Sequence, residues 1–151
     1  MTEKSYNGLK IDVQSFDELT KHELYEILRA RAAVFVVEQE CPYQDVDNTD
    51  FRATHITIRR DDEIVAYARV YKDAQADWWH IGRVLTTRRN ENYGLLVMKE
   101  SIEVAKELGI HHIEIEAQCY AIGFYEKVGF EVCSDEFMLD GLPHKEMRLL
   151  L

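Results

Sequence analysis

The hydrophobic residues of this chain follow two different periods in turn, and this alternation limits the folds that the chain can adopt. Near the start, Leu9, Ile11 and Val13 alternate with polar residues, which is typical of a half-buried β-strand. Helical spacing follows over residues 21–34, directly after a capping box that begins at Thr20 and satisfies free amides at a helix start. A chain that keeps switching between the two periods predicts a mixed α/β fold.

The same patterns give a complete order of predicted elements. Two-residue alternation and short apolar runs bounded by turns predict strands, and spacings of three and four residues predict helices. The predicted strands cover residues 9–13, 55–60, 64–71, 78–87, 113–116, 130–139 and 145–150, and the predicted helices cover 21–34, 94–108 and 120–127. The order is therefore β-α-β-β-β-α-β-α-β-β, a mixed α/β sheet in which we expect two helices to connect parallel strands.

Length and charge exclude several classes of function. The chain has 151 residues, which suits one domain, and 18 Lys and Arg against 28 Asp and Glu give a formal net charge of -10. This charge repels a phosphate backbone, so we expect no nucleic-acid partner. Residues 117–125, the longest stretch without an acidic, basic or histidine side chain, are far fewer than the roughly 20 that cross a bilayer. We expect no membrane span, and because residues 1–10 show no secretory signal, we expect a cytoplasmic protein.

The cysteines favour neither a disulfide framework nor a metal site. Cys41, Cys119 and Cys133 are odd in number and lack the Cys-x-x-Cys spacing of structural zinc sites. We interpret them as reduced thiols and predict no metal. The sequence assigns no general base to Cys41, so we give it no nucleophilic role.

The strongest chemical signal lies between the strand predicted over 78–87 and the helix that follows it. Arg88 and Arg89 precede Gly94 at the helix start, where free amides and the positive end of the helix dipole favour an anion. The alternative interpretation is an ordinary solvated turn with a glycine at the start of a helix. This segment alone leaves both interpretations open.

Two motifs resemble those of the GNAT superfamily of N-acetyltransferases. Residues 89–94 resemble motif A, Arg/Gln-x-x-Gly-x-Gly/Ala, with Asn92 at the first glycine position. Asparagine adopts a left-handed backbone more readily than most residues do. Residues 124–130 resemble motif B, Tyr-x-x-x-Gly-Phe, with Tyr125 at its tyrosine position. Further blocks are similar to the ElaA-like branch of the superfamily: residues 31–39, 41–47, 65–69, 81–84, 117–118 and 140–144.

The resemblance covers essentially the whole chain and implies a fold, an activity and a cofactor site. The implied fold is a GNAT-type mixed central sheet in a single N-acetyltransferase domain over residues 1–151. The implied activity is transfer of an acetyl group from acetyl-CoA to the amine of a small molecule or peptide, without a metal. The strand that would pair with the pantetheine arm contributes Val84, Leu85 and Thr86. The loop that would hold the pyrophosphate contributes Arg88 or Arg89, Asn90, Asn92, Tyr93 and Gly94. The following strand and helix contribute Gln118 and Tyr125 to the implied cofactor site.

The resemblance also implies proton transfers, for which the sequence leaves alternatives open. Tyr125, at the motif B tyrosine, is the expected proton donor to the leaving thiolate, and its alternative is a packed structural tyrosine. His55, His144 and Glu38 are candidates for the general base that deprotonates the amine, and each also has a structural interpretation. The acidic residues 38–50 either attract a cationic amine or form a solvated loop.

Two other functions are compatible with parts of the sequence. A CoA-binding relative with little or no turnover is one alternative, because Asn92 alters motif A. A nucleotide-binding domain is the other, and the absence of both the G-x-G-x-x-G and the G-x-x-x-x-G-K signatures disfavours it. The sequence does not identify the amine acceptor, and it leaves the oligomeric state open, including a homodimer.

Overall fold

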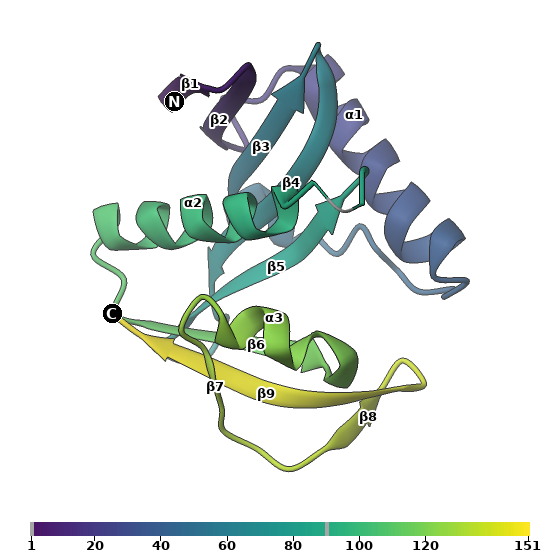
Figure 1. Ribbon diagram of the computed structural model, residues 1–151, viewed down its shortest axis with the longest axis vertical. Helices are drawn as coiled ribbons and strands as arrows, with labels where there is room; N and C mark the ends of the chain where they lie inside the picture. Colours follow the sequence, from purple (N-terminus) through teal and green to yellow (C-terminus); the bar gives the residue numbers. More distant parts are fainter. Residues whose placement is uncertain (1, 90) are drawn as a thin grey trace.

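The computed structural model describes residues 2–89 and 91–151, and in this part of the chain nine strands form one sheet (Figure 1). The strands are β1 Thr2–Tyr6, β2 Leu9–Ser15, β3 Thr54–Arg60, β4 Glu63–Lys72, β5 Trp79–Thr86, β6 His112–Gln118, β7 Glu131–Val132, β8 Phe137–Leu139 and β9 Leu142–Leu150. The helices are α1 Lys21–Arg31, α2 Tyr93–Glu107 and α3 Ile122–Glu126, with a π-helix, η1 Ala32–Glu38, and two 3₁₀-helices, η2 Thr49–Arg52 and η3 Cys119–Ala121.

The sheet is mixed, as the sequence predicts. Its strand order is β1-β2-β3-β4-β5-β6-β9-β7, with β8 paired to β9. Among the described strands, β5 and β6 form the one parallel pair, and the other neighbours are antiparallel. The helix α2 connects β5 to β6, and α3 connects β6 to β7, which run in the same direction on either side of β9. The prediction that two helices connect parallel strands is therefore confirmed.

The structure differs from the predicted elements at two strands. The sequence pattern does not predict β1, because all five of its residues are exposed and it has no apolar face. The range 130–139, predicted as one strand, holds the two short strands β7 and β8 with an irregular segment between them. In both places, hydrogen bonding to a neighbouring strand decides the structure, and the hydrophobic pattern does not report it.

The first helix begins as predicted and ends earlier than predicted. The hydroxyl of Thr20 accepts a hydrogen bond from the Glu23 amide at 3.0 Å, and the Glu23 carboxylate accepts one from the Thr20 amide at 2.8 Å. After Arg31 the helix widens into η1, where the amides of Gln39 and Cys41 bond to carbonyls five residues earlier. This segment is rich in β-branched valines, which crowd the preceding turn of a regular α-helix.

A hydrophobic core lies on each face of the sheet. The helices α2 and α3, at the front in Figure 1, cover one face, where Val97 and Met98 of α2 are fully buried. The helix α1 covers the other face, where Ile27 packs with Tyr67 and Leu85. In the described part of the chain, no helix is both long and apolar enough to cross a membrane.

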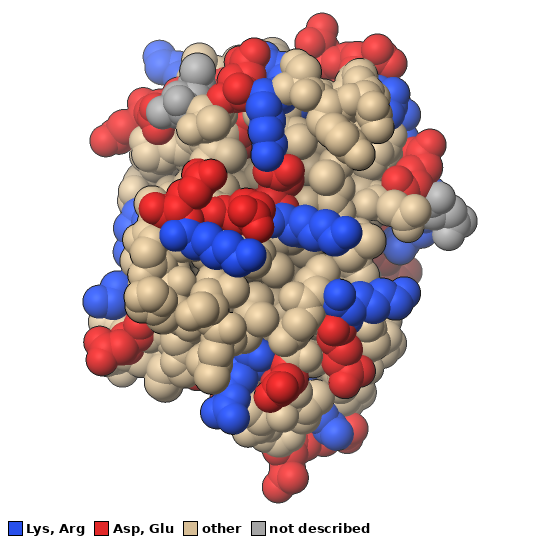
Figure 2. All heavy atoms as spheres, turned by 60° about the vertical axis from the view of Figure 1, so that its left-hand side comes forward, with Lys and Arg blue, Asp and Glu red and all other residues tan. Residues whose placement is uncertain are grey.

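Charged side chains of both signs are spread over the face of the molecule that Figure 2 shows. In the view of Figure 2, acidic and basic side chains alternate, and the described residues on this face form no continuous basic patch. Some of the surface charges pair locally, as Lys106 does with Glu103 at 3.2 Å. Such exposed pairs contribute little to stability because water screens them.

Candidate active site

A β-bulge interrupts strand β5 near its middle. In the pairing of β4 with β5, Tyr67 lies opposite Leu85 and Arg69 lies opposite Gly82, so β5 has one residue more than β4 over this stretch. Arg83, inside the bulge, has a φ of 51°, in the left-handed region that L-residues rarely adopt. A bulge of this kind reverses the faces to which the later side chains of a strand point.

The hydrophobic cores show this reversal directly. Ile81 and Leu85 are four residues apart and would share a face in a regular strand. Instead, Ile81 packs in the core below α2, and Leu85 packs in the core below α1. The bulge therefore turns Val84 and Thr86 to the side of α2, where Val84 contacts the first core and Thr86 lies close to Gly94.

Strands β5 and β6 separate soon after they meet (Figure 1). Among the described residues they share one register pair, Trp79 with Ile113, and β5 then runs away from β6. A cavity of about 550 Å³ lies in the gap, and we call it the strand-gap cavity. Its walls come from η1 and the loop after it, from β5, from β6, and from the segments that carry η3, α3 and the start of β9; they include Phe35, Cys41, Tyr43, Gly82, Arg83, Val84, Glu114, Glu116, Gln118, Tyr120, Tyr125, Asp140 and His144.

A second cavity, of about 350 Å³, lies at the start of α2, and we call it the helix-end cavity. It is lined by Thr86, Arg88, Arg89, Asn92, Tyr93, Gly94, Leu95, Phe124 and Lys127. The structure thus brings together most of the residues that the sequence predicts for the pyrophosphate loop, while the predicted residue Asn90 lies outside the described residues. Thr86 of β5 and Phe124 of α3 line the helix-end cavity. Their near neighbours Val84 and Tyr125 line the strand-gap cavity, so the two cavities adjoin.

The backbone at the start of α2 has a conformation that lets a ligand come close to it. Asn92, which stands in place of the motif A glycine, has the left-handed conformation that we expect of it, with φ 59° and ψ 19°. A Cβ added to Gly94 would lie 3.5 Å from both Phe124 Cζ and Thr86 Cγ2, inside the cavity wall. The Tyr93 ring is buried, and its hydroxyl accepts a hydrogen bond from Arg60 Nε at 2.8 Å, which anchors the first turn of α2.

Three cationic side chains line the helix-end cavity. Arg88 lies 3.5 Å from Glu63, and Arg89 pairs with Glu38 of η1. Lys127 is the third, and the sequence analysis did not assign it a role. Its spacing of three residues from Phe124, which places both on one helical face, is the signal that points to it.

Tyr125 lies in the wall of the strand-gap cavity. Its ring makes edge-to-face contacts with Phe124 and Phe130, and its hydroxyl has no hydrogen-bond partner within residues 2–89 and 91–151. Burial, with a smaller contribution from Tyr120, raises the pKa of this phenol to about 12. The hydroxyl therefore keeps its proton at neutral pH.

His144 is the predicted histidine that reaches the strand-gap cavity. It is 6% exposed and lies opposite Gln118 in the pairing of β6 with β9. Its Nδ1 lies 2.8 Å from the carbonyl oxygen of Leu142, which can only accept a hydrogen bond, so Nδ1 carries the proton in the neutral ring. This tautomer leaves the lone pair of Nε2, which has no partner among the described residues, available as a proton acceptor.

The other two base candidates lie outside this cavity. His55 is fully buried: the Tyr67 hydroxyl donates to its Nδ1 at 2.7 Å, and its Nε2 donates to the Asp50 carbonyl at 3.0 Å. Burial lowers the pKa of His55, so the ring is neutral and structural rather than a base in contact with substrate. Glu38 lines neither cavity and pairs with Arg89.

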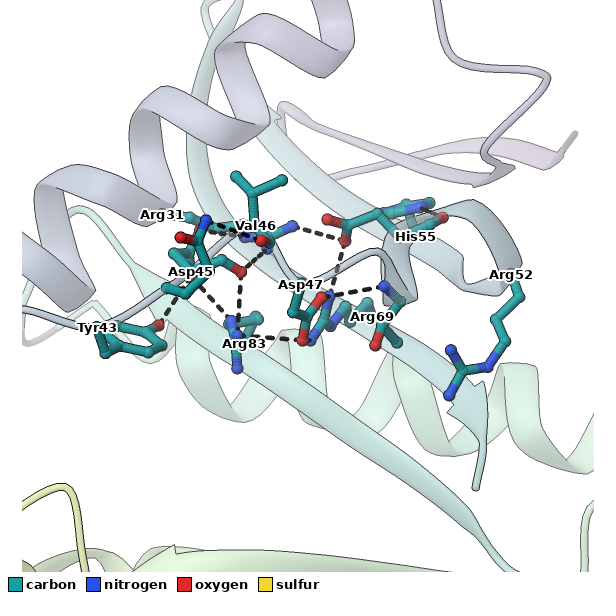
Figure 3. A network of polar contacts seen from close by, with 12 residues as sticks. Arg31, Tyr43, Asp45, Val46, Asp47, Arg52, His55, Arg69 and Arg83 are labelled. Carbon is teal, nitrogen blue, oxygen red and sulfur yellow. Dashed lines mark hydrogen bonds and ion pairs between the residues drawn. The ribbon is translucent and has the colours of Figure 1, made fainter. Parts of the chain in front are cut away.

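The acidic segment 38–50 is neither wholly a solvated loop nor wholly a surface that attracts a cationic amine. Three of its aspartates pair with three arginines instead (Figure 3). Arg31 donates to Asp45 at 3.0 Å and to Asp50 at 2.7 Å. The arginines come from α1, β4 and β5, and the network includes Arg31, Arg69, Arg83, Asp45, Asp47 and Asp50. Asp45 and Asp50 are therefore buried in ion pairs, and Asp47, whose side chain is 31% exposed, is paired with Arg69 and Arg83.

The neighbouring arginines keep the Asp47 and Asp50 carboxyls of this network ionised at neutral pH, because they lower the pKa of each. Burial by itself raises the pKa of the Asp47 carboxyl, but the hydrogen bonds and positive charge of Arg69 outweigh burial and hold the pKa far below its usual range. Asp50 shows the same direction for the same reason, with Arg31 as its main partner. The side chains of Arg69 and Asp50 are 1% and 7% exposed, so this ion pair is shielded from water.

Two further groups of side chains carry possible ligand atoms. Cys41 lines the strand-gap cavity as a free thiol. The ligand atoms of Glu114, Cys133 and Glu146 lie within 4.8 Å of one another on β6, after β7 and on β9. Two members of this trio are exposed, and acidic groups often gather in this way without an ion, so we assign it no metal.

The family model of the acetyltransferase (GNAT) domain matches residues 14–151. The chain belongs to the GNAT acetyltransferase family. Protein ElaA of Escherichia coli is 38% identical over 137 residues, which cover 84% of this chain and 87% of ElaA. A UPF0039 protein of Schizosaccharomyces pombe is 37% identical over 150 residues, which cover 96% of this chain and 99% of that protein.

Solved structures of GNAT proteins share the fold over almost the whole chain. An acyl-CoA N-acyltransferase of Pseudomonas aeruginosa has a TM-score of 0.86 and 31% identity, covering 91% of this chain and 97% of the other. Escherichia coli ElaA has a TM-score of 0.86 and 34% identity, covering 93% and 98%. The predicted GNAT-type sheet and the resemblance to the ElaA-like branch are confirmed, and membership in the GNAT family supports acyl transfer from an acyl-CoA.

Proposed function

We propose that this GNAT protein transfers an acetyl group from acetyl-CoA directly to the amine of a small molecule or peptide. The observation that carries the proposal is the meeting of the two cavities along β5 and α3, with Thr86 and Phe124 on one side and Val84 and Tyr125 on the other. A donor with phosphates at one end and a thioester at the other fits such a path.

The helix-end cavity suits the pyrophosphate of the donor. The amides of Tyr93 and Gly94 belong to the first turn of α2, where backbone N–H groups lack partners within the helix. Lys127 adds positive charge without an ion-pair partner among the described residues, and Arg88 and Arg89 add charge that the exposed Glu63 and Glu38 offset only in part, because water screens these pairs. Gly94 leaves open the volume that a Cβ would fill, so the chain has room for the phosphate oxygens close to its backbone.

The free edge of β5 suits the pantetheine arm. Beyond Trp79, the edge that faces β6 has no neighbouring strand in the described part of the chain. In this proposal the backbone of Val84, Leu85 and Thr86 bonds to the amides of the arm as an added strand would. The Leu85 side chain packs in the core below α1, so Leu85 contributes through its backbone. Gln118, at the end of β6, offers an amide to the same arm or to the start of η3.

Tyr125 and His144 suit the two proton transfers. The amine nitrogen attacks the thioester carbonyl carbon, and the carbon–sulfur bond then breaks. The Nε2 of His144 accepts the proton that the amine loses, directly or through water. The Tyr125 hydroxyl, which its raised pKa keeps protonated, donates its proton to the departing sulfur.

The charges of the strand-gap cavity favour an acceptor that arrives as a cation. Glu116 and Asp140 line the cavity and have no ion-pair partner within residues 2–89 and 91–151. The cation Arg83 in the same wall is already neutralised by Asp45 and Asp47. Arg52, also in this wall, has no carboxylate partner among the described residues, so Glu116 and Asp140 together outweigh it and leave a net negative charge, which attracts a protonated amine.

Thiol release from acetyl-CoA against a panel of primary amines tests the proposal, with mass spectrometry to identify the acetylated product. Calorimetry with acetyl-CoA, coenzyme A and ATP separates donor binding from turnover. Donor binding together with amine-dependent thiol release supports the proposal. Donor binding without thiol release for any amine would establish the alternative, a CoA-binding protein with little or no turnover, and binding of ATP alone would exclude both.

A further inference from the structure

The bulge of β5 is held by a residue whose backbone is unfavourable on its own. Arg83 has a positive φ, a conformation that glycine adopts freely and an L-residue adopts only at a cost. Such conformations persist where surrounding contacts fix them. The faces of Val84, Leu85 and Thr86 all depend on this one residue, since the bulge reverses the side-chain direction after it.

The side chain of Arg83 is fixed by two aspartates of the loop after η1 (Figure 3). Its Nε donates to the Asp45 carboxylate at 2.8 Å, and its Nη2 donates to the Asp45 carbonyl at 3.0 Å and to the Asp47 carboxylate at 3.3 Å. The guanidinium also lies 5.2 Å from the ring centre of Tyr43, whose hydroxyl donates to Asp45 at 2.8 Å. Arg83 is therefore fixed at two of its three donor nitrogens and on one face.

The aspartates are in turn fixed from the other side of the loop. Arg31 of α1 donates to both the carboxylate and the carbonyl of Asp45, and it is fully buried. Arg69 of β4 holds both carboxylate oxygens of Asp47, at 2.9 and 2.7 Å. Breaking one member of such a buried set is costly, because its partners keep their charge without compensation. Through these aspartates, the network attaches the bulge to α1 and β4.

We infer that Arg83 is a positioning residue for acyl-CoA: Asp45 and Asp47 hold it in the left-handed conformation that turns Val84 and Thr86 toward the two cavities. The inference rests on the proposed use of these cavities for acetyl-CoA. The inference predicts that the left-handed backbone conformation of residue 83, and not its β-strand propensity, determines the affinity for the donor.

Two substitutions of Arg83 separate these effects. Arg83→Gly removes the guanidinium but adopts a positive φ without strain, so the bulge persists. Arg83→Ala removes the same contacts and disfavours the positive φ, so β5 relaxes toward regular pairing. Calorimetry with coenzyme A should show binding about tenfold weaker in the alanine variant than in the glycine variant, the change that matches the left-handed cost of one L-residue. Strand propensity alone predicts the opposite order, because glycine weakens strands.

A matched pair of aspartate variants tests the fixing contacts. Both carboxylate oxygens of Asp45 accept from arginines, so either orientation of the amide in Asp45→Asn places an NH₂ group against Arg31 or Arg83. Asp50→Asn also removes one charge, but its remaining oxygen can still accept from Arg31 and Arg69, and Asp50 makes no contact with Arg83. We expect about tenfold weaker binding of coenzyme A for Asp45→Asn and a change of less than about twofold for Asp50→Asn.

Hydrogen exchange of the β5 amides gives a second measurement that needs no ligand. The inference expects faster exchange at residues 84–86 in Arg83→Ala than in Arg83→Gly. Equal or tighter binding of coenzyme A by the alanine variant, or unchanged binding in all four variants, would overturn it. If the unmodified protein binds no coenzyme A, the proposed function fails, and the exchange rates of the two Arg83 variants still decide whether residue 83 sets the geometry of β5.

Discussion

A methyl group added at Gly94 should raise the stability of the free protein and lower its affinity for acetyl-CoA. The added Cβ would lie 3.5 Å from Phe124 Cζ and from Thr86 Cγ2, and 3.6 Å from Phe124 Cε1, which are ordinary van der Waals contacts. Gly94 is the second residue of α2. Replacing glycine by alanine within a helix stabilises a protein by about 0.5–1 kcal/mol. For a chain of this size, this gain corresponds to an increase in Tm of roughly 1–4 °C.

The same methyl group occupies part of the helix-end cavity. A ligand at a hundred times its Kd stabilises the native state by about 2.7 kcal/mol, which is roughly 5–10 °C of Tm for a chain of this size. If Gly94→Ala weakens binding tenfold, the same concentration of acetyl-CoA gives only about 1.4 kcal/mol. Gly94→Val, with two more methyl groups, should abolish the shift. Gly94→Ala should therefore raise the Tm of the free protein and reduce the further increase in Tm that acetyl-CoA gives.

Thermal unfolding with and without acetyl-CoA measures both quantities in one experiment. Gly123→Ala is the matched control, because Gly123 lies in α3 and a Cβ there meets nothing within 4 Å. The control should gain stability as a free protein and keep the full shift with acetyl-CoA. An unchanged shift in both Gly94 variants would place the phosphates elsewhere and refute the assignment of the helix-end cavity.

Further predictions concern catalysis and stability. Tyr125→Phe should lower kcat about 10²-fold with the affinity for acetyl-CoA retained, and the loss should shrink at lower pH, where solvent protonates the thiolate; normal turnover would make the tyrosine structural. His144→Gln should lower kcat with little change in Tm, and an unchanged pH–rate profile would exclude it as the base. The native pKa of His55 lies below its unfolded value of about 6.5, so at low pH the unfolded chain binds a proton that the native protein does not. The stability of the native protein should therefore fall as the pH drops below about 6.5, and His55→Gln should flatten this dependence of Tm on pH. Arg31→Met should cost about 3–5 kcal/mol in urea unfolding because it leaves the three aspartates of the network with only two arginines, Arg69 and Arg83, and a cost below about 1 kcal/mol would contradict this account.

The parts of the fold that depend on local sequence could be predicted. Periodicity and capping locate most strands and the starts of the helices, because each is a property of a few neighbouring residues. The loop from Arg88 to Gly94 is similarly local, and the structure places its described predicted residues around one cavity. The left-handed backbone of Asn92 follows from its residue type at that position.

The parts that depend on distant contacts could not be predicted. His55 and His144 both lie in blocks that resemble the family, and only tertiary packing buries one and opens the other to a cavity. Asp45 meets Arg83 across 38 residues of sequence, so its local acidic context suggests a solvated loop. The spacing of Ile81 and Leu85 predicts one shared face, and the bulge between them reverses it. A single domain, the cytoplasmic location and a homodimer stay predictions from the sequence.

The buried network of arginines and aspartates has a consequence for how ligands reach the protein. It contains three charges of each sign, so it cancels internally and leaves the whole formal charge of -10 to the rest of the molecule. Coenzyme A is an anion, and at low ionic strength it must approach against this field, whereas a protonated amine is drawn in. Since about 0.1 M salt confines the field to roughly 10 Å, added salt should speed the encounter with the donor and slow the encounter with a cationic acceptor. In the proposed reaction, the relative rates at which donor and acceptor bind therefore depend on ionic strength.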